Sequence, residues 1–205
     1  MPWSPNVPPK DSNSFFRWVY DQFLSLSRWM TDTVYSANVS LPSSGINPPG
    51  GASDPARSTT TGLLEFSGTQ DNIIVGAIQM PRGWSTRHAR IHPHIHLRFP
   101  TSAAANTRWK FEYDFGNDVT SFTNVYGTYT TLGTITVANP QDVYKAVHAD
   151  FGTFDISGAS DEPVIVYKIS RLANSDAADT DTNVCVLLDI DLHYYRNSIG
   201  VEQKY

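Results

Sequence analysis

The chain has 205 residues, a length that suits one sizeable domain with an appended segment. Its net charge is −5, and Lys and Arg are scattered, which argues against DNA or RNA as a partner because nucleic-acid binding needs a concentrated basic surface. The single cysteine, Cys185, excludes an internal disulfide, and no apolar run reaches membrane length, so no membrane partner is expected.

The N-terminal region is predicted to hold an extended arm and then a helix. Four prolines in residues 1–13 favour an extended, Pro-rich arm, and residues 14–38 predict an amphipathic helix. Its apolar positions recur at alternating steps of three and four, as the a and d positions of a coiled coil do. These candidate oligomerisation or anchoring residues are Phe16, Val19, Phe23, Leu26 and Met30. The stripe must be covered, either by the chain's own domain or by other copies, with a trimer favoured.

Residues 39–60 are rich in Pro, Gly and Ser and predict a linker. From residue 61 to residue 205 the period changes to two, and turn-rich separators divide about eight strand-like runs. The runs lie near 62–67, 73–80, 89–99, 107–116, 128–137, 143–149, 163–171 and 183–195. The predicted fold is therefore all-β, a jelly-roll-like antiparallel β-sandwich of about eight strands.

Two runs alternate most clearly between apolar and polar residues. In 107–116, Trp109 and Phe111 belong to an apolar face, and charged side chains occupy the other. In 184–193, even-numbered residues such as Ile190 form the apolar face, and Asp189, Asp191 and His193 form a polar one that we interpret as exposed.

The run 89–99 carries three histidines. Residues two apart share a face of a strand, so His92, His94 and His96 line up on one side. Pro93 cannot donate to a neighbouring strand, which predicts an edge strand or a bulge.

Three interpretations of this histidine strand remain open. Imidazoles two apart on a strand can share a metal ion, within one chain or on a symmetry axis. Alternatively, a hairpin with 107–116 would place Glu112 and Asp114 opposite the histidines as a polar face without metal. The strand can also be a metal-free subunit contact.

The pair His94 and His96 resembles the metal-binding strand of the cupin family, but the resemblance ends there. A cupin would continue with a nearby glutamate and a second histidine in a Gly/Pro-rich motif, whereas Leu97–Pro100 contains no acid and His148 lacks that motif. Nucleophile elbows, phosphate loops and paired zinc cysteines are also missing. We therefore predict no enzyme activity and no cofactor.

Three segments together resemble a group of virion-associated proteins of tailed bacteriophages: Ile78–Trp84, Ile91–His96 and Trp109–Tyr113. The resemblance covers about residues 70–115. It implies a jelly-roll-like domain assembled on a capsid, neck or tail, and it supplies no catalytic residues.

The sequence therefore predicts a structural virion protein, assembled in the bacterial host cytoplasm, that binds other virion proteins and its own copies. Its roles would be capsid cement or decoration, or head–tail or tail attachment. One alternative is a glycan- or receptor-binding module of a tail appendage that uses Tyr126, Tyr129, Tyr194 and Tyr195. A second is a cupin-like, metal-dependent enzyme built on the histidine strand and His193.

Overall fold

A computed structural model describes residues 17–23, 34–48, 50–81, 84, 89–116, 129–159 and 163–197. Residues 17–23 are helical, and Ser43–Gly45 form a short 3-10 helix, η1. None of the helices in these ranges is long and apolar enough to span a membrane.

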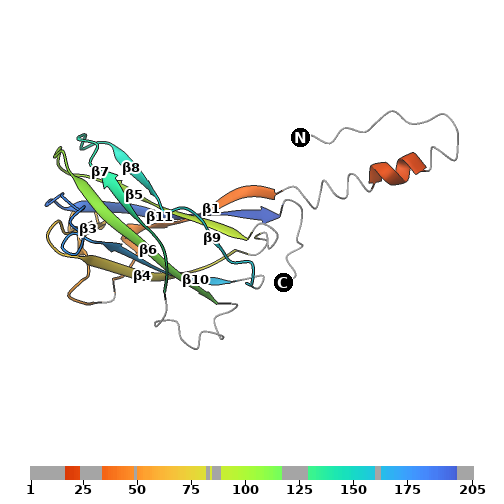
Figure 1. The fold of residues 1–205 in the computed structure, drawn as a ribbon, viewed down its shortest axis with the longest axis horizontal. Coiled ribbons are helices and arrows are strands. Elements are labelled where there is room, and N and C mark those ends of the chain that lie inside the picture. Colours follow the sequence, from red (N-terminus) through yellow and green to blue (C-terminus); the bar gives the residue numbers. More distant parts are fainter. Residues whose placement is uncertain are drawn as a thin grey trace.

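Two antiparallel sheets form a sandwich, which confirms the predicted fold class (Figure 1). The larger sheet contains β1 (Val34–Pro42), β2 (Ala56–Arg57), β3 (Leu64–Phe66), β5 (Arg90–Arg98), β8 (Ala146–Asp150), β9 (Phe154–Asp155) and β11 (Cys185–Asn197). The smaller sheet contains β4 (Asn72–Gln79), β6 (Asn106–Gly116), β7 (Thr130–Ala138) and β10 (Val164–Arg171), in the order β4-β10-β6-β7. The described residues thus hold eleven strands, of which β2 and β9 have two residues each.

In the larger sheet, β11 and β5 are the central strands. β11 pairs with β5 along one side, and along its other side it pairs with β3 at its start and with β1 from Asp189 to Asn197. β5 pairs in turn with β8 and β9. Every segment of this sheet therefore depends directly or indirectly on β11, the longest strand.

The core lies between the sheets and is built by the inward side chains of the alternating strands. Trp109 and Phe111 of β6 are fully buried, as the alternation in 107–116 predicts. Trp109 contacts Phe66 of the opposite sheet, with ring centroids 4.9 Å apart. Each large apolar side chain buried this way stabilises the fold by about 1.5–3 kcal/mol, so these contacts hold the sheets together. Cys185 is also fully buried.

The sandwich begins earlier than predicted. Residues 34–38, assigned to the helix, and the first residues of the 39–60 linker form strand β1. Val39 and Leu41 pack against the core and alternate with exposed Asn38 and Ser40, a period-two pattern hidden beside the helical stripe. Buried Ser43 then donates its hydroxyl to the Leu187 carbonyl at 2.5 Å, which anchors part of the supposed linker.

A buried ion pair joins the smaller sheet to the loop before β11. The Arg171 guanidinium contacts both carboxylate oxygens of Asp179 at 2.9 and 3.0 Å, and both side chains are fully buried. It also donates to the carbonyls of Phe66 in the larger sheet, at 3.1 Å, and Asn183, at 2.8 Å. Asp179 accepts the Arg108 backbone N–H at 2.8 Å. These hydrogen bonds offset the loss of water around two buried charges.

We predict that Arg171→Met lowers the free energy of unfolding by about 3–5 kcal/mol, because it leaves the Asp179 carboxylate buried without its cation. Urea denaturation measures the change. Asp176→Asn is the matched control, since it weakens the partly exposed Arg108–Asp176 pair, and a much smaller loss is expected. Equal losses in the two variants would contradict this account of the Arg171 pair.

Candidate functional site

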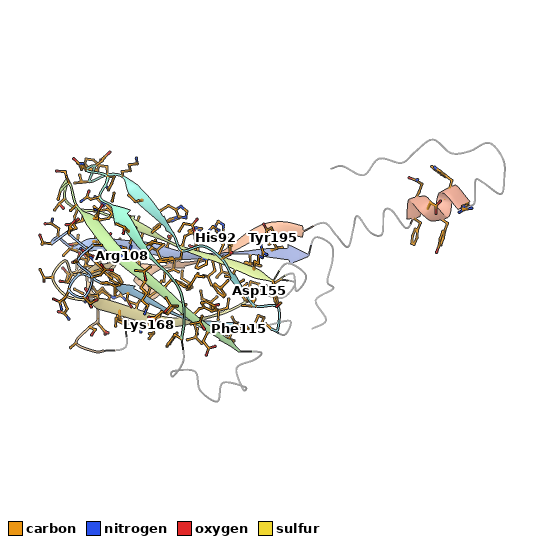
Figure 2. All side chains as sticks on the ribbon, in the orientation of Figure 1. His92, Arg108, Phe115, Asp155, Lys168 and Tyr195 are labelled. Atoms are coloured by element: carbon orange, nitrogen blue, oxygen red, sulfur yellow. The ribbon has the colours of Figure 1, made fainter. Side chains whose placement is uncertain are left out.

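Strand β5 places its histidines on the outer face of the larger sheet. Ile91, Ile95 and Leu97 point into the core and are fully buried. His92, His94 and His96 occupy the alternate positions, so they share the opposite face, where Figure 2 labels His92. The shared face expected from the sequence is confirmed.

Pro93 was expected to mark an edge strand or a bulge. The edge strand is wrong, because β5 has neighbours on both sides, and the register between β5 and β11 shifts opposite Leu97 and His96 and not at Pro93. The Pro93 carbonyl accepts the Phe151 N–H at 3.3 Å, so the backbone oxygen and nitrogen of Pro93 face β8 and β9. That is where β8 ends at Asp150 and β9 has not yet begun. The missing N–H of proline therefore faces a break in the neighbouring strand, where the sheet tolerates it.

A bulge in β11 brings carboxylates to the same face. Leu187 pairs with Leu97 and Asp189 with His96, which leaves Leu188 as an extra residue. Before the bulge the odd-numbered residues Cys185 and Leu187 are buried, and after it the even-numbered Ile190 is buried. The bulge thus reverses the phase of the strand and turns the odd-numbered acids outward. The predicted alternation holds only after this point.

Three strands together build what we call the histidine cluster. Its members are His92, His94 and His96 of β5, His148 and Asp150 of β8, and Asp189, Asp191 and His193 of β11. Five of the chain's six histidines gather here, brought together by the register that pairs His94 with Asp191 on one side and with Asp150 on the other.

Each β5 histidine contacts one carboxylate. His92 Nε2 lies 2.6 Å from Asp150 Oδ1, and His96 Nδ1 lies 2.8 Å from Asp189 Oδ1. The central distance is longer, with 3.5 Å between His94 Nε2 and Asp191 Oδ2. The two outer pairs are at hydrogen-bonding distance, whereas the central one is not.

His94 lies at the centre of the rings. Its centroid is 4.2 Å from that of His148 and 4.3 Å from that of His193, both near perpendicular. The His96 and His92 centroids are 5.4 and 5.7 Å away. These rings cover His94, which is only 4% exposed although it lies on the outer face, and Asp191 beside it is 6% exposed.

The two central side chains keep polar atoms without hydrogen-bond partners among the described residues: His94 Nδ1 and Asp191 Oδ1. Burial lowers the pKa of His94 to about 4, with a further contribution from repulsion by His148 and His193. His94 is therefore a neutral imidazole at neutral pH.

The flanking carboxylates respond differently to their surroundings. Burial raises the pKa of Asp189, and the neighbouring charge of Asp191 adds to the effect although His96 opposes it. Burial also disfavours the charged form of Asp150, but hydrogen bonds from the Gly152 N–H and His92 outweigh it and lower that pKa. The charged form of Asp150, beside His92, is therefore better compensated than that of Asp189, beside His96.

Three sets of side chains in the cluster bring ligand atoms within 4.8 Å of one another, close enough to be drawn onto one metal ion. They are His94, His96 and His148; His94, Asp191 and His193; and His96, Asp189 and Asp191. Imidazole and carboxylate ligands suit a divalent transition metal better than Mg²⁺ or Ca²⁺.

The sequence identified part of this site. Of the predicted ligands, His94 and His96 belong to these sets and His92 does not, because it pairs with Asp150. The expected partners Glu112 and Asp114 lie in β6, in the other sheet, since the chain crosses over after β5 instead of forming a hairpin. Glu112 binds Lys110 at 2.8 Å and Lys168 at 3.0 Å.

The remaining ligand candidates come from strands that are distant in the sequence. His148 was set aside because it lacks a cupin motif, and Asp191 was interpreted as exposed although it is buried. Their alternation with apolar neighbours indicates a shared face within each strand. It does not indicate which strands are neighbours.

No protein-family model and no curated protein matches this sequence. Among solved structures, the isomalto-dextranase of Arthrobacter globiformis T6 complexed with panose is 13% identical over 76% of this chain, with a TM-score of 0.40. This chain spans only 23% of that protein's length.

Two smaller proteins are also similar in structure. TmCBM61, in complex with β-1,4-galactotriose, is 7% identical, with 82% of this chain and 90% of that chain covered and a TM-score of 0.30. The CBM22-1 xylan-binding domain of Paenibacillus barcinonensis Xyn10C is 11% identical, with 73% and 100% covered and a TM-score of 0.29. At these identities and TM-scores the likenesses carry no argument about ligand or activity.

The low pKa of His94 predicts a pH-dependent stability of the metal-free protein. His94 titrates near 6.5 when unfolded and at about 4 when folded, so between these values the unfolded chain binds more protons. The free energy of unfolding therefore falls as the pH falls through this window, by on the order of 3 kcal/mol from His94 alone.

Urea denaturation in the presence of a chelator, at several pH values across this window, measures the dependence. His94→Asn removes the titrating group, and the variant should lose this part of the slope. The comparison is the difference in slope between the variant and the wild type. An unchanged slope in the variant would contradict a neutral, buried His94.

Proposed function

We propose that the chain is a non-enzymatic structural subunit of a bacteriophage virion: a capsid cement or decoration protein, or a head–tail or tail attachment component. One observation carries the proposal. The helix at 17–23 exposes Val19, Tyr20 and Phe23, at 42%, 62% and 67% of their surface. Apolar side chains gathered on one short helix favour contact with another protein surface.

The most suitable occupant of that surface is the same helix in other copies of the chain. Val19 and Phe23 lie on the predicted a and d stripe, while Phe16, Leu26 and Met30 fall outside the described residues. A helix of this length is marginal in isolation, so its stability must come largely from packing. Three copies of the helix supply that packing and leave each sandwich out of the helix contact. Many such subunits, each with a modest contact, then attach firmly to a particle.

The sandwich supports a division in which the N-terminal segment makes the contacts between copies and the sandwich folds on its own. Its core is complete within one chain, since the inward side chains of β5, β6 and β10 are buried without a partner. The resemblance of residues 78–84, 91–96 and 109–113 to virion-associated proteins favours a particle as its place of assembly. The sandwich would be displayed while the N-terminal segment attaches it.

The glycan-binding alternative has less support. Tyr194 is 7% exposed and cannot offer its ring face to a sugar. Tyr129 precedes β7 in the smaller sheet, whereas Tyr195 belongs to β11 in the larger one, and Tyr126 lies outside the described residues. Tyr129 and Tyr195 therefore do not share one sheet face.

We predict that the chain forms an oligomer, with a trimer favoured, and that Val19→Glu combined with Phe23→Glu weakens association at least about 100-fold. Placing two carboxylates in the stripe removes the burial of two apolar side chains per chain. Light scattering after size-exclusion chromatography measures the mass. Asp21→Asn on the same helix is the control and should leave the oligomer intact.

Circular dichroism checks that the double variant keeps its β-sandwich. A wild-type chain that is monomeric at micromolar concentration contradicts the proposal, as does a double variant of unchanged mass.

Attachment to a particle is tested by mixing the wild-type chain with phage particles prepared without it and sedimenting them. Wild-type protein should sediment with the particles, and the double variant should remain in the supernatant. Wild-type protein that stays in the supernatant would exclude the structural virion role, even if the chain oligomerises.

A further inference from the structure

We propose that the histidine cluster binds one divalent transition-metal ion per chain, with zinc as the best fit, through His94, Asp191 and His193. The ion would join β5 to β11, the two central strands of the larger sheet. This inference is independent of the helix and of the proposed virion role.

The first support is the contrast between the three His–Asp pairs. His92–Asp150 is a hydrogen bond of 2.6 Å, and His96 Nδ1 approaches Asp189 Oδ1 to 2.8 Å. The central pair stays at 3.5 Å, too long for a hydrogen bond, although it is the most buried. A set of His–Asp contacts evolved only to cover the sheet would be expected to close its central pair as well.

The second support is that the central pair retains unpartnered atoms. Both His94 and Asp191 are more than nine-tenths buried, and His94 Nδ1 and Asp191 Oδ1 have no hydrogen-bond partner among the described residues. A buried carboxylate needs a compensating charge or a full set of hydrogen bonds. A bound cation would supply the missing charge.

The third support is geometric. Asp191 lies directly opposite His94, and His193 follows Asp191 by two residues, so all three project from the same face. Their ligand atoms lie within 4.8 Å of one another. Zinc with bonds of roughly 2.0–2.2 Å needs ligand atoms about 3.4 Å apart, a closure that side-chain rotation provides. The bulge at Leu188 is what turns these β11 side chains outward.

The other ligand candidates of the cluster flank this site; they are His96, Asp189 and His148. The Asp189 carboxylate lies 2.8 Å from Nδ1 of His96, and this contact orients the His96 ring beside the site. His148 is exposed and lies against His94, on the solvent side of the cluster. A water molecule or His148 can fill a fourth position. Two imidazoles and a carboxylate favour Zn²⁺ or Co²⁺ over Mg²⁺ or Ca²⁺.

Metal binding is tested on the full chain, purified without an affinity tag and stripped with a chelator. Titration with zinc chloride, followed by calorimetry and elemental analysis, should show one ion per chain with micromolar or tighter affinity. Zinc should raise the melting temperature by about 5 °C or more at saturating concentration. Cobalt should give the intense visible absorption of a site with four or five ligands.

Variants then identify the ligands. His193→Ala and Asp191→Asn should each weaken zinc binding at least about 30-fold. His92→Ala is the matched control, because it removes a histidine from the same face that pairs with Asp150, and affinity should change less than about threefold. Circular dichroism of the stripped variants separates lost binding from lost folding.

Three results would overturn the proposal: no zinc bound at micromolar concentration, equal losses in His92→Ala and His193→Ala, or a loss in His148→Ala while His193→Ala binds normally. The last result would place the ion on His94, His96 and His148 instead. The Val19→Glu and Phe23→Glu variant should bind zinc normally, so failure of the helix proposal and failure of the metal proposal are distinguishable.

Discussion

The antiparallel pairing of β5 with β11 is the constraint on which the rest of the structure depends. One face of the pair supplies Ile95, Leu97 and Ile190 to the core, and the other supplies the histidines and carboxylates of the histidine cluster. A shift of one residue in this register would exchange the two faces and bury the imidazoles in place of the aliphatic side chains. The bulge at Leu188 is needed for the same reason. Before it, the odd-numbered residues of β11 enter the core, and after it the odd-numbered acids lie on the outer face while the strand stays paired in the sheet.

Two of the places where the described residues bury charged or ionisable groups are built differently. The Arg171–Asp179 pair lies in the interior and is surrounded by hydrogen bonds to carbonyls and a backbone N–H, as a structural ion pair must be. The His94–Asp191 pair lies on the outer face, shielded by other imidazoles, and its hydrogen bonding is incomplete. Three of the buried polar atoms without a hydrogen-bond partner among the described residues lie in the histidine cluster: His94 Nδ1, Asp189 Oδ1 and Asp191 Oδ1. Their grouping indicates a position adapted to something besides folding, and here the ligand chemistry favours a metal ion.

Much of the fold follows from local patterns, while the site depends on pairings between distant strands. The alternation in 107–116 and in 89–99 correctly indicates which face enters the core, because one sheet face must be apolar. Strand β1 was missed since Val34–Pro42 has a weak period-two pattern next to a stronger helical one. The bulge at Leu188 leaves only an unbroken apolar run, Val184–Leu188, as its trace. The choice of Asp191 rather than Glu112 as the partner of the β5 histidines depends on which strands become neighbours, and single-strand periodicity carries no such information.

Two separable proposals result: the N-terminal helix would gather copies of the chain, and a metal ion would join the central strands of the β-sandwich. The second concerns the structure most directly, because it addresses why the most buried of the three His–Asp pairs is also the longest. A crystal of zinc-loaded protein, with anomalous diffraction recorded on both sides of the zinc absorption edge, locates the ion without reference to function. The account predicts one anomalous peak per chain, within bonding distance of His94, Asp191 and His193. No peak at the cluster, with His94 and Asp191 instead closing to a direct hydrogen bond, would contradict it.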